Sequence, residues 1–276
     1  DLPLNRGNYN FVLNAQGRIL GDLYIFNRGE FLLLETDRRQ VEILLSTLKR
    51  FIIMDKVELR DLGGGVTAIG LCGPRTAQVL EQAGIAASGM EPLEVRESSG
   101  LTLIRGPEQK PCWFEIWLEP AQAASLWKKL TEAGAQPAGS EALEMWRVLR
   151  GIPQYGQDIR DRDLPQETGQ TQALHFNKGC YIGQEIVERI RSRGQVHRKF
   201  TGFEFEGTAP ALGKYEVEGR AVAEITTALR VPGTAGERSL GLGYVRHDAL
   251  SAGPQVELQG HKATVVDLPF KNQVDG

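Results

Sequence analysis

Residues 176–185 read Phe-Asn-Lys-Gly-Cys-Tyr-Ile-Gly-Gln-Glu, and this stretch is the most informative part of the chain. Ile182, Ile186 and Ile190 recur at a spacing of four, which predicts one apolar face of a helix. Cys180 is therefore expected at or just before the N-terminus of that helix, where free N–H groups and the positive end of the dipole favour a thiolate. The plain alternative is a small buried residue at a helix start, as most lone cysteines are.

Cations and glycines surround this cysteine in the sequence. The cations that would favour a thiolate are Lys178, Arg189, Arg191, Arg193 and Arg198. Glu185 is placed to pair with Arg189 one helical turn later. Gly179 and Gly183 have no side chain, so the backbone there can approach a ligand closely. The stretch thus combines a thiol, positive charge and an open backbone.

The composition is that of an ordinary globular protein, with 276 residues of which 41% are hydrophobic and 24% charged. This length is enough for one large or two ordinary domains. The formal net charge is −3, so no basic field indicates a nucleic-acid partner. Apolar runs such as residues 51–54 fall far short of the roughly 20 residues of a transmembrane helix, so no membrane partner is expected.

The thiols and imidazoles do not have the spacing of a preformed metal site. Cys72, Cys112 and Cys180 include no CxxC pair, which argues against a disulfide framework and favours a reducing compartment. The histidines show no HxxxH or HxH spacing, and no metal ligands are predicted. The chain begins at Asp1 without a signal-like apolar stretch, and a transit peptide would precede this residue.

Two similar α+β halves are predicted by the order of apolar patterns and turns. Strands are expected at residues 9–13, 18–26, 31–34, 54–62, 66–72, 101–104 and 113–118. Helices are expected from Asp37, from Pro74 to Gly84, from Pro120 to Gly134 and over residues 141–150. A hairpin followed by a helix thus occurs twice.

The pattern changes near residue 197, which is the best single boundary. Beyond it, short apolar segments alternate with Gly/Pro turns at residues 221–227, 240–246, 255–259 and 263–268. Such spacing predicts a small all-β sandwich or barrel.

Residues 178–185, Lys-Gly-Cys-Tyr-Ile-Gly-Gln-Glu, resemble the signature of the YgfZ family, a branch of the glycine-cleavage T-protein superfamily with mitochondrial relatives in iron–sulphur cluster assembly. Further resemblance to superfamily landmarks lies at residues 13–22, 70–74, 147–159, 223–227, 242–245 and 268–270. The resemblance spans essentially the whole chain. It implies an α+β fold in which ferredoxin-like halves form a folate-binding module over residues 1–197, followed by a C-terminal β-barrel over residues 198–276.

The function implied by this resemblance is that of a tetrahydrofolate-binding accessory protein for assembly or repair of iron–sulphur clusters. Its partners would be cluster-assembly proteins or client enzymes such as radical-SAM enzymes that modify tRNA. Cys180 would be the catalytic thiol, within a motif formed by Lys178, Gly179, Tyr181, Gly183, Gln184 and Glu185. The implied location is the bacterial cytoplasm, with the mitochondrial matrix as the alternative.

Two departures from the T-protein pattern argue against an aminomethyltransferase with turnover. Leu149 stands where T-proteins carry the glutamate that anchors the pterin, and leucine accepts no hydrogen bond. The aspartate pair of the first hairpin is reduced to Gly21-Asp22. A tetrahydrofolate-dependent aminomethyl- or methyltransferase is therefore kept as the alternative function. A third interpretation is a binding scaffold in which folate is a structural ligand.

The folate itself would contact Asp22, Arg147, Tyr155, Arg189 and Arg193. Asp22 either orients the N5/N10 edge of the folate or is an exposed carboxylate at a strand end. Arg147 either binds a ligand carboxylate or forms an ordinary bridge to Glu144. Tyr155 either stacks on the pterin or packs in the core, and the two later arginines either bind the glutamate tail, poise Cys180, or form a solvated face.

Overall fold

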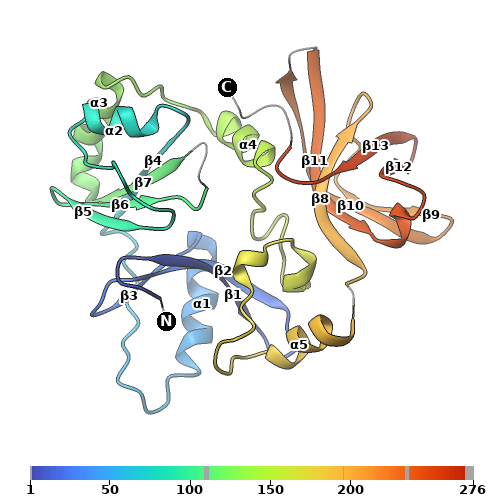
Figure 1. The fold of residues 1–276 in the computed structure, drawn as a ribbon, viewed down its shortest axis with the longest axis horizontal. Coiled ribbons are helices and arrows are strands. Elements are labelled where there is room, and N and C mark those ends of the chain that lie inside the picture. Colours follow the sequence, from blue (N-terminus) through green and yellow to red (C-terminus); the bar gives the residue numbers. More distant parts are fainter. Residues whose placement is uncertain (1, 109–111, 195, 234–235, 271–276) are drawn as a thin grey trace. The chain divides into compact units, whose positions relative to one another are not determined.

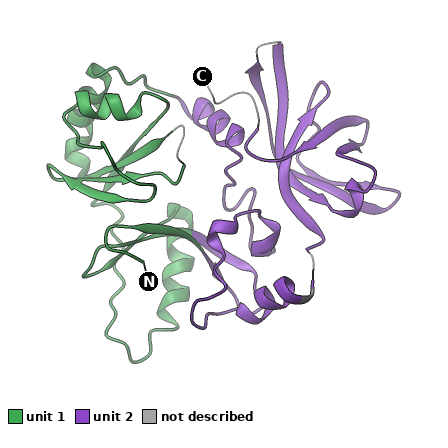
Figure 2. Ribbon diagram, in the orientation of Figure 1, with its two compact units in different colours: residues 1–10, 23–138, 276 green, residues 11–22, 139–275 purple. Residues whose placement is uncertain are grey.

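The structure is a computed structural model that describes residues 2–108, 112–194, 196–233 and 236–270 (Figure 1). By the contacts within the chain, it divides into two units (Figure 2). Among the described residues, unit 1 comprises 2–10 and 23–138, and unit 2 comprises 11–22 and 139–270. The first hairpin therefore contributes to both units, with its tip in unit 2.

Unit 1 is built on two antiparallel sheets. The first has the order β1 (Gly7–Leu13), β2 (Ile19–Asn27) and β3 (Leu32–Glu35), and is followed by a short 3-10 turn and helix α1 (Val41–Lys49). The second has the order β4 (Thr67–Cys72), β7 (Trp113–Leu118), β6 (Leu101–Arg105) and β5 (Val95–Ser98). Helices α2 (Thr76–Gln82) and α3 (Ala123–Glu132) accompany this second sheet.

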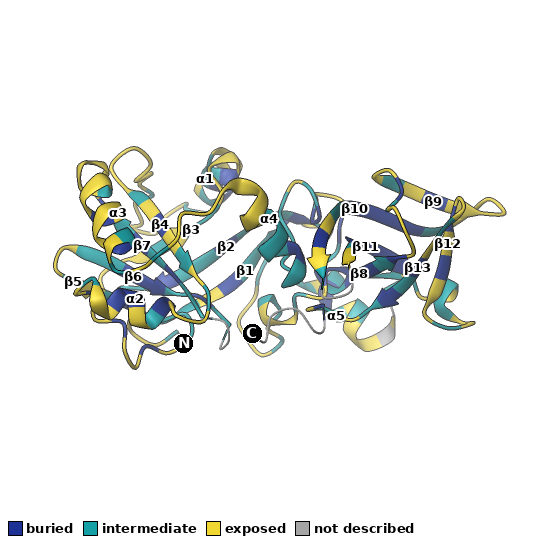
Figure 3. Cartoon of the chain, turned by 90° about the horizontal axis from the view of Figure 1, so that it is seen from above, coloured by how far each residue is buried: buried dark blue, intermediate teal, exposed yellow. Residues whose placement is uncertain are grey.

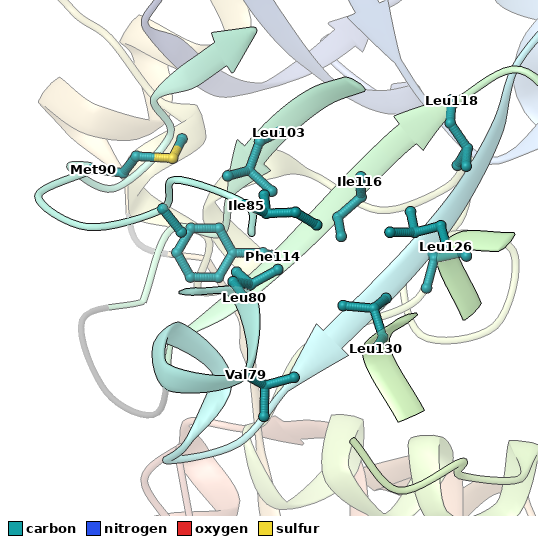
Figure 4. Packing of buried hydrophobic residues seen from close by; sticks show 12 residues of the cluster. Val79, Leu80, Ile85, Met90, Leu103, Phe114, Ile116, Leu118, Leu126 and Leu130 are labelled. Atoms are coloured by element: carbon teal, nitrogen blue, oxygen red, sulfur yellow. The ribbon is translucent and has the colours of Figure 1, made fainter. Parts of the chain in front are cut away.

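Apolar side chains pack against both faces of the second sheet, as strand β7 shows. Its residues alternate, so that Phe114, Ile116 and Leu118 are buried while the residues between them are half-buried. The buried set packs with Leu80 and Leu126 of the two helices in one apolar cluster (Figure 4). On the opposite face, a smaller cluster joins Phe26 of β2, Val95 of β5 and Ile104 of β6, with Trp117 against it.

Unit 2 begins with helix α4 (Ser140–Leu149), continues through irregular segments with two 3-10 turns, and reaches helix α5 (Gln184–Arg193). Six strands follow: β8 (Arg198–Phe205), β9 (Gly213–Val217), β10 (Arg220–Gly233), β11 (Gly236–Arg246), β12 (Gln255–Leu258) and β13 (His261–Val266). They form one sheet in the order β12-β13-β8-β11-β10-β9, with most buried residues on β8, β10 and β11 (Figure 3). The end strands β12 and β9 are in contact, so the sheet is nearly closed.

The predicted α+β class and the C-terminal barrel are confirmed. The predicted boundary at residue 197 coincides with the start of β8, whereas the contacts group residues 139–194 with the barrel. The strand predicted over residues 54–62 is wrong, because this segment is irregular and pairs with no strand of the described residues. Ile53 and Met54 are 84% and 92% exposed, so the apolar pattern there reflects no burial.

Gly243 is a position where the barrel tolerates no side chain. It pairs with Ile225 of β10 beside a register shift, and a Cβ there would collide with the carbonyl oxygen of Glu224. We expect Gly243→Ala to lower the free energy of unfolding by roughly 1–3 kcal/mol, the usual effect of overpacking. Urea denaturation followed by circular dichroism measures this loss.

The matched control is Gly70→Ala in strand β4, where a Cβ would meet nothing within 4 Å. Its free energy of unfolding should change by no more than about 0.5 kcal/mol. Equal losses in the two variants would contradict the packing argument.

Candidate functional site

The motif cysteine lies in an exposed loop ahead of helix α5. The helix begins at Gln184 with Gly183 as its N-cap, so Cys180 lies three residues before the cap rather than at the helix N-terminus. Of the two predicted positions, at the helix N-terminus or just before it, the structure has the second. Cys180 is also exposed, which excludes the alternative of a small buried residue. Its neighbours Lys178 and Gly179 are exposed as well.

Gly183 and Gln184 give this loop its shape. The backbone of Gly183 is left-handed, with φ of 81°, and a Cβ there would come within 2.5 Å of the Asn14 carbonyl oxygen. The Gln184 side chain accepts a hydrogen bond from the Tyr181 N–H at 3.1 Å. The Gln184 N–H in turn donates to the Tyr181 carbonyl oxygen at 3.3 Å. These two motif residues are thus explained by the geometry of the turn.

Tyr181 anchors the loop. Its half-buried ring packs against the cluster of Leu13, Ile19, Ile159 and Val187. Burial, together with the nearby charge of Glu188, raises the pKa of Tyr181. The Lys178 ammonium lies 4.5 Å from the centre of the same ring, a cation–π contact that holds this cation on the aromatic face.

The loop rests on the tip of the first hairpin. Asn14 organises this tip, because its side-chain oxygen accepts hydrogen bonds from the N–H groups of Gln16 and Arg18. Gly17 has φ of 69°, and a Cβ there would come within 2.9 Å of Ile186 in helix α5. Two glycines, one on each side, therefore allow the hairpin and the motif segment to approach closely.

Asp22 and Tyr155 are brought together by the same hairpin. Asp22 is half-buried near the tip of β2, and the Tyr155 hydroxyl donates to the Leu20 carbonyl oxygen at 2.8 Å. Burial raises the pKa of Tyr155 to about 12, with further contributions from the charges of Asp161, Asp22 and Asp163. Tyr155 is thus protonated at neutral pH and lies within the electrostatic reach of Asp22.

Arg147 is fully engaged with protein groups. Its guanidinium donates to both carboxylate oxygens of Glu144 at 2.8 and 2.6 Å, and to Asp158 at 2.6 Å. This is the ordinary bridge that the sequence analysis weighed against ligand binding, and it lowers the pKa of Glu144. The neighbouring Leu149 packs against an apolar cluster that includes Phe200 and Leu242 of the barrel.

A buried ionic network lies near Arg147 and was not predicted from the sequence. Asp158 is fully buried and accepts hydrogen bonds from the hydroxyls of Thr226 and Thr227 at 2.5 and 2.7 Å. Asp163, also fully buried, accepts from Arg198 at 2.7 Å and from Tyr244 at 3.2 Å. The alternating charges of residues 160–163 were the available signal.

Glu224 of strand β10 completes this network. Its carboxylate forms ion pairs with Arg160 at 2.9 Å, Arg162 at 2.6 Å and Arg198 at 3.1 Å. Burial raises the pKa of Glu224, but these arginines outweigh it and lower the pKa below its ordinary value. The network therefore joins the segment after helix α4 to the barrel, within unit 2.

In the part of the chain that the structure describes, no contact places the remaining predicted site residues beside Asp22. Arg189 and Glu185 are exposed on helix α5, and the predicted ion pair between them is not found there. Instead, Arg191 pairs with Glu188 at 3.7 Å and lies 4.2 Å over the Phe176 ring. The side chain of Arg193 lies outside the described residues.

The other two cysteines lie in unit 1. Cys72 is exposed at the end of β4. The partial burial of its thiol nevertheless raises its pKa. Cys112 is half-buried against the core of unit 1. In the part of the chain that the structure describes, no group of three or more His, Cys, Asp or Glu residues could hold a metal ion. None of the helices described there is long and apolar enough to cross a membrane.

Comparison with known proteins identifies the family. A family model described as the GCVT N-terminal domain matches residues 112–178. The aminomethyltransferase of Rubrobacter xylanophilus is 31% identical over 274 residues, which cover 96% of this chain and 73% of that protein. The chain belongs to the glycine-cleavage T-protein superfamily. The aminomethyltransferase of Rippkaea orientalis, at 28% identity, covers 98% of the chain and 77% of its own length.

Two further comparisons describe this T-protein superfamily member. A putative chloroplastic transferase of Arabidopsis thaliana is 26% identical, covering 87% of the chain and 56% of that protein. The crystal structure of the glycine cleavage system aminomethyltransferase T from Bartonella henselae matches with a TM-score of 0.81 at 22% identity, over 98% of the chain and 77% of that structure. This likeness shows the fold. Membership of the YgfZ branch stays a prediction.

The shape of the motif loop is testable at Gly183. We expect Gly183→Ala to lower the free energy of unfolding by roughly 1–3 kcal/mol, because the added Cβ meets the Asn14 carbonyl in a left-handed backbone. The displaced loop should also change the rate at which iodoacetamide labels Cys180. Thermal unfolding and timed mass spectrometry of the labelled thiol measure the two effects.

Gly179→Ala is the control within the same motif. A Cβ at Gly179 would meet nothing within 4 Å, so stability and labelling should stay near those of the wild type. If both alanine variants behaved alike, Gly183 would not be the residue that shapes the loop.

Proposed function

We propose that this T-protein superfamily member binds a reduced folate, tetrahydrofolate, and takes part in transfer of an aminomethyl or methyl group. The observation that carries the proposal is that Tyr155 is hydrogen-bonded to the hairpin that carries Asp22, within reach of the charge of Asp22. Support also comes from relatives named aminomethyltransferase, whose similarity covers 96–98% of the chain. These relatives favour the transferase reading over the accessory role that the sequence analysis put first.

Each of the two residues has a distinct part in this proposal. Asp22 supplies a carboxylate that is only half-buried, and such a group orients or accepts a proton from a ligand nitrogen. The Tyr155 hydroxyl already donates to the Leu20 carbonyl, so the group it offers a flat heterocycle is the face of its ring. Arg147 is assigned to the fold instead, since Glu144 and Asp158 occupy its guanidinium.

Leu149 argues for weak folate binding. It packs among apolar side chains and has no acceptor for the N–H donors of a pterin. A charge-assisted hydrogen bond is worth about 1.5–3 kcal/mol, so affinity should be roughly ten- to a hundredfold below that of a protein with a glutamate there.

Tetrahydrofolate titration tests the ligand directly. We expect saturable binding by calorimetry or ligand fluorescence, and a roughly tenfold or greater loss of affinity in Asp22→Ala, because a charged hydrogen-bond partner is removed. Asp161→Ala is the matched control, since it removes an exposed charge beside the same tyrosine. No signal at millimolar tetrahydrofolate would refute folate binding, and equal losses in both variants would refute the role of Asp22.

A second candidate function is the iron–sulphur accessory role implied by the resemblance to the YgfZ family. The observation that favours it is the exposed thiol of Cys180 in a loop shaped by Gly183 and Gln184. Its partners would be iron–sulphur client enzymes or cluster-assembly proteins. Thiolates are ligands and nucleophiles for such chemistry, whereas the proposed group transfer makes no use of Cys180.

Cys180→Ser separates the two candidates. A serine keeps the size but offers neither a thiolate nor a soft metal ligand. If the accessory role holds, this variant folds and binds tetrahydrofolate, yet fails to restore iron–sulphur enzyme activity in cells that lack the protein. Cys72→Ser, at another exposed cysteine, should restore it fully. Full complementation by Cys180→Ser would refute the accessory role and leave the transferase proposal standing.

A further inference from the structure

Strand β3 is an edge strand whose exposed side chains are large and apolar. It is the last strand in the order β1-β2-β3, and no strand of the described residues pairs with its outer side. Leu32 and Leu34 lie on one face and are 59% and 37% exposed, and Phe31 just before them is 57% exposed. Leu33 packs on the other face, against the smaller apolar cluster of unit 1. An open edge of this kind is a template for pairing with another strand.

The main-chain groups of Leu32 and Leu34 point to this open edge. On β2, the carbonyl oxygen and the N–H of Asn27 bond to Asn5 and Arg6 at 2.7 and 2.9 Å, so Asn27 faces away from β3. Hydrogen-bonded and non-bonded pairs alternate along an antiparallel ladder. Asn27 pairs with Leu32, so the next pair is bonded and the pair that contains Leu34 is again not. The N–H and C=O groups of both leucines therefore face outward.

The edge at β3 differs from the other edges of the described sheets. In the barrel, the end strands β9 and β12 contact each other. At β5, residues 93–95 form hydrogen bonds and a bridge with residues 5–7 at the start of β1. The exposed residues of β4 are the small Ala68, Gly70 and Cys72. In β3, by contrast, there is no lysine, proline or register shift, three of the devices that usually protect an edge.

Two charges of opposite sign flank the exposed leucines at equal distance. Glu30 lies four residues before Leu34, and Arg38 lies four residues after it. Both side chains are exposed, and neither forms an ion pair within the described residues, since the neighbouring Asp37 is paired with Arg39. The backbone is still extended at Asp37, so Arg38 lies close to the line of the strand. The segment is therefore complementary in charge to a reversed copy of itself.

We propose that β3 pairs with β3 of a second copy of this chain, antiparallel about a two-fold axis through Leu34. The two Leu34 residues then exchange two hydrogen bonds through their outward N–H and C=O groups. Leu32 of each copy lies diagonal to Leu34 of the other on the same face, so the exposed leucines of both copies cover one another. The pairing uses none of the residues assigned to folate or to the motif cysteine, and it is independent of the proposed function.

The flanking charges select this register. Outward residues must face outward residues, so the axis passes through a residue and not between two. An axis through Leu33 meets this condition as well, but it places Glu30 opposite Thr36, which carries no charge. The axis through Leu34 places Glu30 of each copy opposite Arg38 of the other, which gives one ion pair at each end of the contact.

Sedimentation equilibrium of the full chain measures the association. The contact of two strand edges is small, so we expect a monomer–dimer equilibrium within roughly 1–500 µM protein rather than a permanent dimer. Leu34→Lys should weaken dimerisation by roughly tenfold or more, because two like charges then face each other at the axis. Leu143→Lys, at an exposed leucine of α4, is the matched control and should dimerise as the wild type does. Circular dichroism checks that both variants fold.

Exchange of the flanking charges tests the register at exposed positions that leave the fold unchanged. Glu30→Arg places two arginines together, and Arg38→Glu places two glutamates together. Each single variant should weaken dimerisation by roughly threefold or more, with the larger effect at low salt. The double variant Glu30→Arg/Arg38→Glu restores opposite charges and should recover the wild-type dimer. A double variant no better than its parents would overturn the register.

Hydrogen exchange locates the contact within the dimer. The Leu34 amide faces the open edge, so its protection should rise with protein concentration, whereas that of the Leu33 amide, which is bonded to β2, should stay constant. A wild-type chain that remains monomeric over the whole concentration range overturns the proposal. So does a dimer that Leu34→Lys leaves unchanged, because another surface then forms it.

Discussion

The structure of unit 2 depends on the buried carboxylate of Asp158. A carboxylate removed from solvent is tolerated only when hydrogen-bond or ion-pair partners surround it. The Asp158 carboxylate accepts hydrogen bonds from Arg147, Thr226, Thr227 and the Gln154 N–H. Its partners come from helix α4, from the following turn and from strand β10. Removing one partner of such a buried pair typically costs about 3–5 kcal/mol, because the other charge is left unpaired. This requirement holds the segment before the motif against the barrel, and it also explains why Arg147 is not available to a ligand.

The second constraint is the close approach between the hairpin tip and the motif loop. Gly17 and Gly183 are both left-handed, and both leave room that a side chain would fill. The hairpin that carries Asp22 therefore also fixes the segment that presents Cys180. The motif of residues 178–185 thus has two kinds of residue. Tyr181, Gly183 and Gln184 build the turn, while Lys178, Gly179 and Cys180 are exposed on it.

Arginines balance the buried carboxylates of unit 2. In unit 2, three arginines converge on Glu224 and keep it ionised. Two of these arginines come from the run of alternating charges at residues 160–163. Because these arginines lower the pKa of Glu224, the stability that they contribute is lost in acid.

Local periodicity in the sequence was sufficient to predict the α+β class, the alternating strand at residues 113–118, the helix that ends before Gly134 and the short strands of the barrel. Each of these follows from burial of one face, which repeats every two or every three to four residues. The tertiary structure alone decided that residues 54–62 form no strand, that Cys180 precedes the helix cap, and that Asp158 meets Thr226. A strand needs a neighbouring strand, and the start of a helix depends on what its first turn contacts. A hydrogen bond between residues 68 positions apart leaves no local pattern in the sequence.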